Sequence, residues 1–170
     1  MEKLLTVISH DDFNSLIRKQ NLLESEFNNH VTQVLKDDII NYFKDILGFD
    51  DVGCIMCLYK VNGRNIDIKK NYNNLNEYLE VASDCVILQF KANKPLMITM
   101  SFDDFLCINH KYDGELISHT GSDASDVIAF VPYIKLKDSK YFISLDENWG
   151  AVDMDVDPVN IGDVRRMDLC

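Results

Sequence analysis

Three aspartates near the end of the chain have the spacing most suggestive of chemistry. Asp153, Asp155 and Asp157 alternate with apolar residues, as in the first half of a calcium-binding EF-hand loop. That loop also needs glycine at its sixth position and glutamate at its twelfth, where this chain has Pro158 and Val164. The alternation instead predicts a half-buried strand with three carboxylates on its solvent face. Because like charges in a row repel one another, we expect a basic partner to bind this strand.

Two further pairs of residues have the spacing of zinc ligands. Cys54 and Cys57 are separated by two residues, and so are Cys107 and His110. Zinc-binding pairs usually lie in polar turns, whereas both of these pairs have apolar neighbours. A redox Cys-x-x-Cys motif needs its first thiol at a helix N-terminus, and the residues around Cys54 predict a strand. We therefore expect core cysteines, with His110 at a helix end, and neither a metal nor a cofactor.

The polar stretch after His110 brings hydroxyl, imidazole and carboxylate groups into one segment. Ser118, His119 and Asp123 lie in a predicted loop of about a dozen residues, a length at which loops are often functional. Catalytic triads, however, are assembled from distant elements. The chain also contains no G-x-S-x-G, Walker, G-x-G-x-x-G or H-E-x-x-H motif. We expect a polar surface loop without catalytic residues, and the alternative is a lid over a small-ligand site.

The order of the predicted elements offers one enzymatic alternative. A strand that ends at His10, a helix after it and a late strand close to Glu147 resemble the layout of ADP-ribosyltransferase-type domains. This resemblance covers only the order of elements. It implies that His10 binds a nicotinamide cofactor and that Glu147 is the catalytic acid. The hydroxyl motif on a middle strand and the paired acids near the end of such domains are not evident here, so we favour a protein that is not an enzyme.

The longest apolar-rich stretch, residues 84–110, organises the predicted fold. Residues 85–90 and 96–100 predict two strands that form the central strand pair. Ser101 then leads into a short helix with acidic residues in its first turn. A later apolar run contains Pro132, which cannot donate a hydrogen bond to a neighbouring strand. We therefore expect that run to form an edge or bulged strand.

Other local patterns predict the remaining elements. Residues 52–61 predict a strand, Asn62-Gly63 a tight turn, and residues 64–68 the returning antiparallel strand. Residues 30–47 predict the longest helix, which ends at Gly48. Its apolar stripe, which we expect to pack in the core, consists of Val31, Val34, Leu35, Ile39, Tyr42, Phe43 and Ile46.

Together these elements predict an α+β fold. We expect a single domain over residues 1–170, built on one mixed or mostly antiparallel sheet of five to seven strands. One long helix and two or three short helices are expected to pack on one face of that sheet. The content of 46% apolar and 26% charged residues is ordinary for a globular chain.

Charge is the one global property that departs from the average. The chain has 28 acidic and 17 basic residues, which gives a formal net charge of −11. Such a charge repels phosphate and disfavours direct nucleic-acid binding, whereas it favours encounter with a basic protein. No apolar run is long enough to span a membrane, and the N-terminus lacks the layout of a signal peptide. Because five cysteines is an odd number, we expect free thiols in the reducing cytoplasm.

The sequence therefore predicts a small acidic cytoplasmic protein that inhibits or neutralises a basic, nucleic-acid-handling partner. Immunity proteins against nuclease toxins and phage inhibitors of host defence nucleases, such as anti-CRISPR proteins, use carboxylates in this way to occupy sites shaped for phosphates. The alternatives are an enzyme or nucleotide binder, and a structural or assembly subunit that uses an exposed sheet edge. No membrane is expected as a partner. The predicted partner-binding residues are Asp153, Asp155, Asp157, Asp146, Glu147, Asp123 and Asp126.

Overall fold

The computed structural model describes five parts of the chain. These are residues 1–25, 30–68, 85–121, 123–144 and 163–166, and for residues 140–144 and 163–166 only the backbone is described. The strand predicted to carry Asp153, Asp155 and Asp157 therefore lies outside the described residues.

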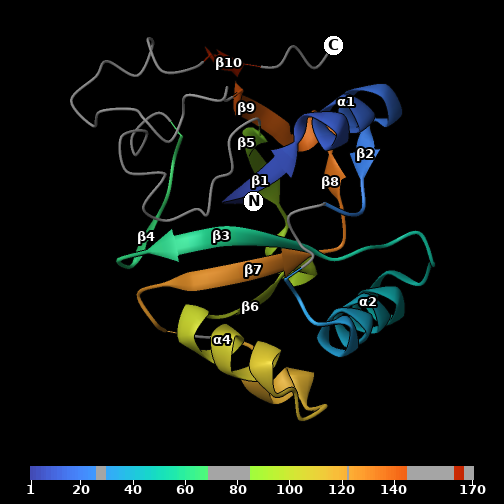
Figure 1. The fold of residues 1–170 in the computed structure, drawn as a ribbon, viewed down its shortest axis with the longest axis vertical. Helices are drawn as coiled ribbons and strands as arrows, with labels where there is room; N and C mark the ends of the chain where they lie inside the picture. Colours follow the sequence, from blue (N-terminus) through green and yellow to red (C-terminus); the bar gives the residue numbers. More distant parts are fainter. Residues whose placement is uncertain (26–29, 69–84, 122, 145–162, 167–170) are drawn as a thin grey trace.

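An antiparallel sheet of eight strands forms the centre of the fold (Figure 1). In order across the sheet, its strands are β10 (Asp163–Arg166), β9 (Ser139–Ser144), β5 (Cys85–Ala92), β1 (Glu2–Ser9), β3 (Ile55–Val61), β7 (Val127–Val131) and β6 (Ile98–Ser101), with β4 (Arg64–Asn65) beside β3. β1 and β5 pair along their full length, from Glu2 opposite Ala92 to Ser9 opposite Cys85. A separate pair of short strands joins β2 (Asn21–Leu22) to β8 (Ile134–Lys135).

Helices cover both faces of this sheet, not one face as predicted. The helices of the described residues are α1 (His10–Lys19), α2 (Gln33–Leu47), α4 (Phe102–His110) and the 3-10 helices η3 (Lys94–Leu96), η4 (Leu116–His119) and η5 (Leu136–Asp138). α1 lies on one side of the sheet, and α2 and α4 lie on the other (Figure 1). The predicted α+β class is confirmed, and every strand pairing found in the described residues is antiparallel.

The helix ends follow from local chemistry. Ser9 caps α1, and its hydroxyl accepts a hydrogen bond from the Asp12 backbone N–H at 3.0 Å. Ser101 caps α4 in the same way, through the Asp104 N–H at 3.0 Å. α2 ends at Gly48, whose φ of 73° is a left-handed conformation that glycine adopts without steric cost.

An apolar core lies between each face of the sheet and the helices that cover it, because the central strands are apolar on both faces. All five residues of β7 are buried, so alternate side chains enter opposite cores. The α1 core contains Leu4, Ile8, Phe13, Leu16, Leu22, Ile55, Cys57, Tyr59, Val86, Leu88, Phe90, Met97, Val127, Ala129, Val131 and Ile134. The α2–α4 core contains Val31, Leu35, Ile39, Phe43, Val52, Cys54, Ile98, Met100, Phe105, Ile108, Leu116, Ile128 and Phe130.

The two strands within residues 84–110 are not neighbours in the sheet, so the predicted central strand pair was wrong. β5 lies between β9 and β1, whereas β6 lies at the far edge of the sheet, beside β7. Both hydrogen-bonding edges of β5 are already occupied, by β1 and β9. The connection through η3, with Pro95 in its first turn, therefore carries the chain away from β5.

Pro132 does not place its strand at an edge, so the edge alternative of that prediction was wrong, whereas the β3–β7 pairing does contain a register shift, between Leu58 and Lys60 of β3. β7 ends at Val131, one residue before the proline, and it pairs with β3 on one side and β6 on the other. The edge strand is β6. There the Gly121 backbone N–H donates a hydrogen bond of 2.7 Å to the Thr99 carbonyl.

The predicted hairpin at Asn62-Gly63 is confirmed, although its second strand is short. Asn62 and Gly63 both have positive φ angles, of 53° and 77°, as a type I′ turn requires. Only Arg64–Asn65 pair as β4, and the chain then turns inward. Ile68 is fully buried, and its backbone N–H donates to the Gln89 side-chain oxygen at 2.9 Å.

Gly53 marks a close approach between two backbone segments just before β3. A Cβ atom at this position would lie 1.9 Å from the Leu23 carbonyl oxygen. The Gly53 N–H also donates to the Pro132 carbonyl at 2.7 Å. Only glycine therefore fits here.

Within the described ranges, no helix has the length and apolar character needed to cross a bilayer.

Candidate interaction surface

Most of the acidic residues predicted to bind a partner lie outside the described residues. These are Asp146, Glu147, Asp153, Asp155 and Asp157. The two others, Asp123 and Asp126, are exposed in the segment before β7.

Asp126 has a structural contact that its sequence context did not reveal. Its side-chain Oδ1 accepts a hydrogen bond from the Asn62 backbone N–H at 3.0 Å. Its carbonyl also accepts a hydrogen bond from the Phe102 N–H at 3.1 Å. Asp126 therefore holds the β3–β4 turn and the start of α4 against β7.

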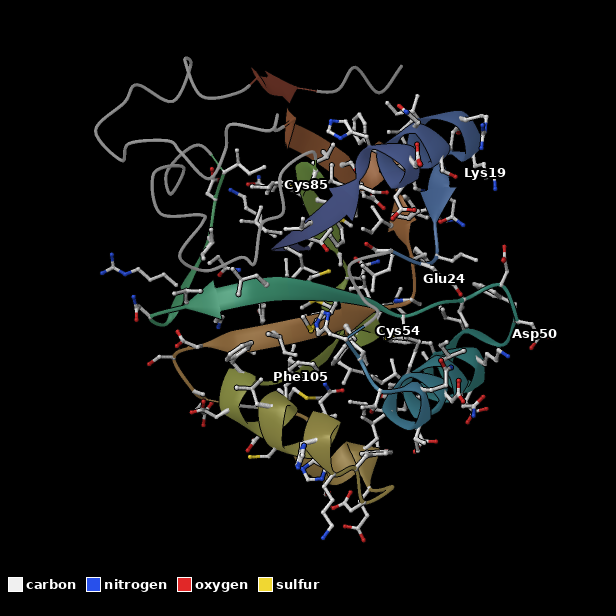
Figure 2. All side chains as sticks on the ribbon, in the orientation of Figure 1. Lys19, Glu24, Asp50, Cys54, Cys85 and Phe105 are labelled. Atoms are coloured by element: carbon white, nitrogen blue, oxygen red, sulfur yellow. The ribbon has the colours of Figure 1, made fainter. Side chains whose placement is uncertain are left out.

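Cys54, Cys57 and Cys107, three of the residues at zinc-ligand spacing, do not come together in the fold. Cys54, just before β3, lies in the α2–α4 core (Figure 2), whereas Cys57 lies in the α1 core on the opposite face. Burial raises the pKa of the Cys54 thiol to about 12 and that of Cys57 well above its ordinary value. Cys107 is exposed on α4, so the expectation that it is a core residue was wrong. Among the described residues, no group of three or more metal-ligating side chains converges.

The resemblance to ADP-ribosyltransferase-type domains assigned roles to His10 and Glu147, and the structure describes only the first of these two residues. His10 begins α1 directly after β1, as the resemblance implied, whereas Glu147 lies outside the described residues.

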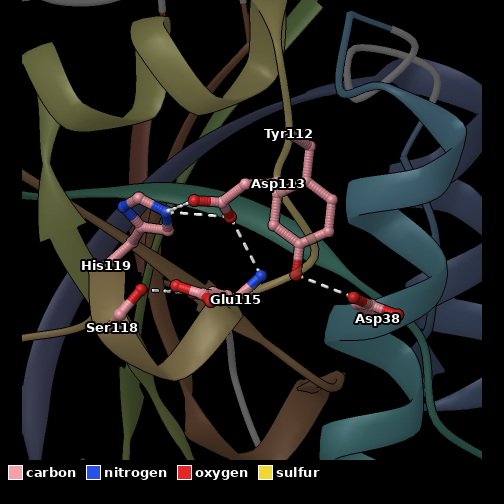
Figure 3. Close-up of polar contacts among 6 residues, drawn as sticks. All are labelled: Asp38, Tyr112, Asp113, Glu115, Ser118 and His119. Carbon is pink, nitrogen blue, oxygen red and sulfur yellow. Dashed lines mark hydrogen bonds and ion pairs between the residues drawn. The ribbon is translucent and has the colours of Figure 1, made fainter.

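The segment 112–119 is tightly organised, although its composition predicted an irregular loop. Asp113 Oδ1 accepts a hydrogen bond from the Glu115 backbone N–H at 2.9 Å, and the His119 Nε2 lies 3.2 Å from both carboxylate oxygens (Figure 3). The Glu115 backbone and the His119 side chain both lower the pKa of Asp113. Ser118 donates its hydroxyl proton to the Glu115 carbonyl at 2.7 Å.

These contacts resemble part of a catalytic triad but do not prepare a nucleophile. The Ser118 and Thr120 hydroxyls both donate to backbone carbonyls of the same segment. Among the described residues, the His119 ring bonds to the Asp113 carboxylate and to neither of these hydroxyls. The His119–Asp113 pair therefore closes a turn, and a triad in this segment is not favoured.

One hydrogen bond ties this segment to α2. The Tyr112 hydroxyl donates to Asp38 Oδ2 at 2.7 Å (Figure 3). Burial and the neighbouring Asp38 carboxylate raise the pKa of Tyr112 far above its ordinary value, so the phenol stays protonated. The bond fixes the orientation of the Asp38 carboxylate.

A shallow groove lies between α2 and η4, and we call it the α2–η4 groove. Its α2 side is lined by Asp38, Asn41, Tyr42 and Asp45, and its other side by residues 114–118. Three carboxylates, those of Asp38, Asp45 and Glu115, thus line one hollow. No lysine or arginine of the described residues forms an ion pair with them.

Ionisable side chains are divided unevenly between the two sides of the sheet. Residues 30–52 and 98–126, which we call the acidic half, carry eleven acidic and three basic side chains. Residues 1–25, 53–68, 85–97 and 127–139 carry six acidic and nine basic side chains. Carboxylate oxygens are prominent around α2 and α4 in Figure 2. The acids of the acidic half are Asp37, Asp38, Asp45, Asp50, Asp51, Asp103, Asp104, Asp113, Glu115, Asp123 and Asp126.

Exposed apolar side chains gather on the same half. Val34, which lies on α2 four residues before Asp38, is 65% exposed, and Ile117, which lines the α2–η4 groove, is 62% exposed. Val34 and Ile46 were predicted to be core residues, but only Leu35, Ile39 and Phe43 of α2 are buried. Six exposed large apolar residues lie in this half, and two, Met1 and Ile17, lie elsewhere in the described chain. The six are Val34, Ile46, Phe49, Phe102, Leu106 and Ile117.

Comparison with known proteins identifies no relative. No protein-family model matches the chain, and no curated protein or solved structure is significantly similar to it. The function is therefore argued from this surface alone.

Sequence reasoning did not find the acidic half, because its residues are far apart in the chain. α2 and the segment 112–119 are about 70 residues apart in the chain, and the fold brings them into direct contact, as the Tyr112–Asp38 bond shows. One signal was present in the sequence. Val34 and Asp38 lie four residues apart and therefore on the same side of α2, so the outer side of this helix combines apolar and acidic residues.

Proposed function

We propose that the chain is a small acidic binding protein that inhibits a basic, nucleic-acid-handling protein. The observation that carries the proposal is the acidic half, where exposed apolar side chains are interspersed with eleven acidic ones. Acidic surface alone serves solubility in many proteins. Exposed apolar residues in the same region favour a protein interface, since their burial supplies affinity while the carboxylates supply steering and specificity.

Charge complementarity favours a basic partner. A basic surface on a nucleic-acid-handling protein is arranged for phosphates, and carboxylates on a rigid scaffold can occupy the same positions. Repulsion between this chain and free nucleic acid makes direct nucleic-acid binding the weaker reading. Among the counted residues, the opposite side of the sheet is less acidic, and this difference in charge would orient the acidic half toward a positive surface during encounter.

Affinity capture followed by a direct binding measurement tests the proposal. The captured protein is purified, and its association with this chain is measured between about 50 and 500 mM salt. We expect a basic protein whose association rate falls at least about tenfold over this range, and whose nucleic-acid binding or cleavage is blocked. A binding partner that is neutral or acidic, or an association insensitive to salt, would overturn the proposal.

A charge-matched pair of variants locates the surface. Asp37→Asn with Asp103→Asn removes two exposed acids from the acidic half, and Asp11→Asn with Glu24→Gln removes two exposed acids from the other side. We expect the first pair to slow association more than the second, at equal melting temperature. Equal effects would assign the binding to net charge and not to this surface.

A further inference from the structure

We propose that the α2–η4 groove is the anchoring point of this interface, and that it receives an arginine flanked by apolar residues on the basic partner. This inference rests on the proposed function and adds the position and chemistry of the anchor. The groove brings the exposed Ile117 side chain together with three carboxylates, and it lies within the acidic half.

The shape and lining of the groove suit a basic side chain with apolar neighbours. Val34 and Ile117 are the two most exposed large apolar residues of the acidic half. Ile117 lines the groove, and Val34 lies on α2 four residues before Asp38, which also lines it. Leu116 is buried beneath η4, and Tyr42 contributes an aromatic ring to the lining. An apolar residue before or after the arginine would cover Val34 or Ile117, and burial of such a pair supplies binding free energy.

The carboxylates favour arginine over lysine. A guanidinium donates in a planar fork that matches a carboxylate, and it also stacks on an aromatic ring such as that of Tyr42. Asp38 is already oriented, because Tyr112 holds its Oδ2 at 2.7 Å. An acceptor fixed before binding loses less conformational entropy when the partner arrives.

Asp45 indicates that the groove is not optimised for the stability of the free protein. It lies in the last turn of α2, where the helix dipole is negative and disfavours an acid. It also shares the groove with Asp38 and Glu115, and no basic residue of the described chain forms an ion pair with it. A bound cation would relieve both unfavourable interactions.

Variants of Asp45, Glu115 and Ile117 separate binding from folding. We expect Asp45→Asn to raise the melting temperature by about 1–3 °C. We expect the same substitution to weaken binding of the captured basic protein at least about tenfold. Glu115→Gln and Ile117→Ser should also weaken binding. Asp50→Asn and Leu106→Ser serve as matched controls, since they remove an exposed acid and an exposed apolar residue that do not line the groove.

A synthetic peptide tests the arginine preference directly. In this peptide arginine alternates with leucine, and matched versions carry lysine or glutamine in place of arginine. Backbone amide NMR titration should show saturable shifts in residues 33–47 and 112–119, tightest for the arginine version and absent for the glutamine version. Equal affinity for the lysine and arginine versions, or shifts confined to α4 and residues 123–126, would overturn the inference.

The outcomes distinguish this inference from the proposed function. If a basic protein binds with strong salt dependence but the groove variants bind as well as Asp50→Asn, the groove is not the anchor and the proposed function stands. If no basic protein binds, both fail. If the captured molecule is a second copy of this chain, the acidic half is a self-association surface and both are wrong.

Discussion

The Tyr112 hydroxyl and the Asp38 carboxylate, 74 residues apart in the chain, meet at 2.7 Å and join the segment 112–119 to α2. This bond ties α2 to the chain two residues before Gly114, where the opposite side of the α2–η4 groove begins. The Asp38 carboxylate, one of the three that line the groove, is therefore held by a contact between two distant segments of the chain.

Removal of this bond should lower stability by a measurable amount. Tyr112→Phe leaves the Asp38 carboxylate without its donor, and we expect a loss of about 1 kcal/mol in the free energy of unfolding. Urea denaturation measures the change. Tyr133→Phe is the matched control, since the ring of Tyr133 contacts the Lys135 amine at 4.8 Å without using its hydroxyl. A Tyr112→Phe protein as stable as the control would mean that solvent fully replaces the bond.

Gly53→Ala should be among the most damaging single substitutions in the described chain. The new Cβ would lie 1.9 Å from the Leu23 carbonyl oxygen, and backbone must move to accommodate it. We expect a loss of about 2 kcal/mol or more, measured by urea denaturation. Gly48→Ala is the comparison, because its Cβ meets nothing within 4 Å and only the φ of 73° opposes it. Its cost should be about 1 kcal/mol, and equal costs would contradict the close approach at Gly53.

Acid should open the segment 112–119 locally. The pKa of Asp113 is lowered from its ordinary value of 3.8, first by the Glu115 backbone N–H and then by His119. The ionised carboxylate therefore stabilises the closed turn above that ordinary value, and this contribution is lost as the pH falls through the lowered pKa. The Glu115 amide resonance should follow this transition, and Asp113→Asn should abolish it. An Asp113→Asn protein with the same acid transition would show that another group controls the turn.

The thiols should differ sharply in reactivity. Burial raises the pKa of Cys54 to about 12, so almost no thiolate exists near pH 8. In a Cys170→Ser background, we expect a thiol reagent to label Cys107 rapidly, and Cys54, Cys57 and Cys85 only after unfolding. Mass spectrometry identifies the labelled residue, and Cys107→Ser should remove the rapid phase. Rapid labelling of Cys54 in the folded protein would mean that the α2–α4 core opens easily.

Local signals in the sequence predicted the ends of elements well. Ser101 caps α4 and Gly48 ends α2 as their residue types indicate, and the Asn62-Gly63 turn forms as expected. Each of these outcomes depends on backbone chemistry within a few residues, which a sequence displays directly.

Non-local relationships could not be predicted in the same way. β5 and β6 look like a hairpin in sequence, yet three strands separate them, because β1 and β9 occupy both edges of β5. The exposure of Val34 likewise depends on where α2 meets the sheet, since Leu35, Ile39 and Phe43 already fill that contact. The groove itself depends on the meeting of α2 with η4, which no pattern within either segment reveals.

The hydrogen bond from Gly121 to the Thr99 carbonyl has a consequence for how these molecules behave when crowded together. β6 is only four residues long, and alternate residues of an edge strand point their backbone groups outward. Because the Thr99 carbonyl already accepts a hydrogen bond, it is not available to pair with the backbone of another molecule that would add a ninth strand. This hydrogen bond therefore disfavours growth of the sheet from molecule to molecule, the first step toward fibrils, at this edge.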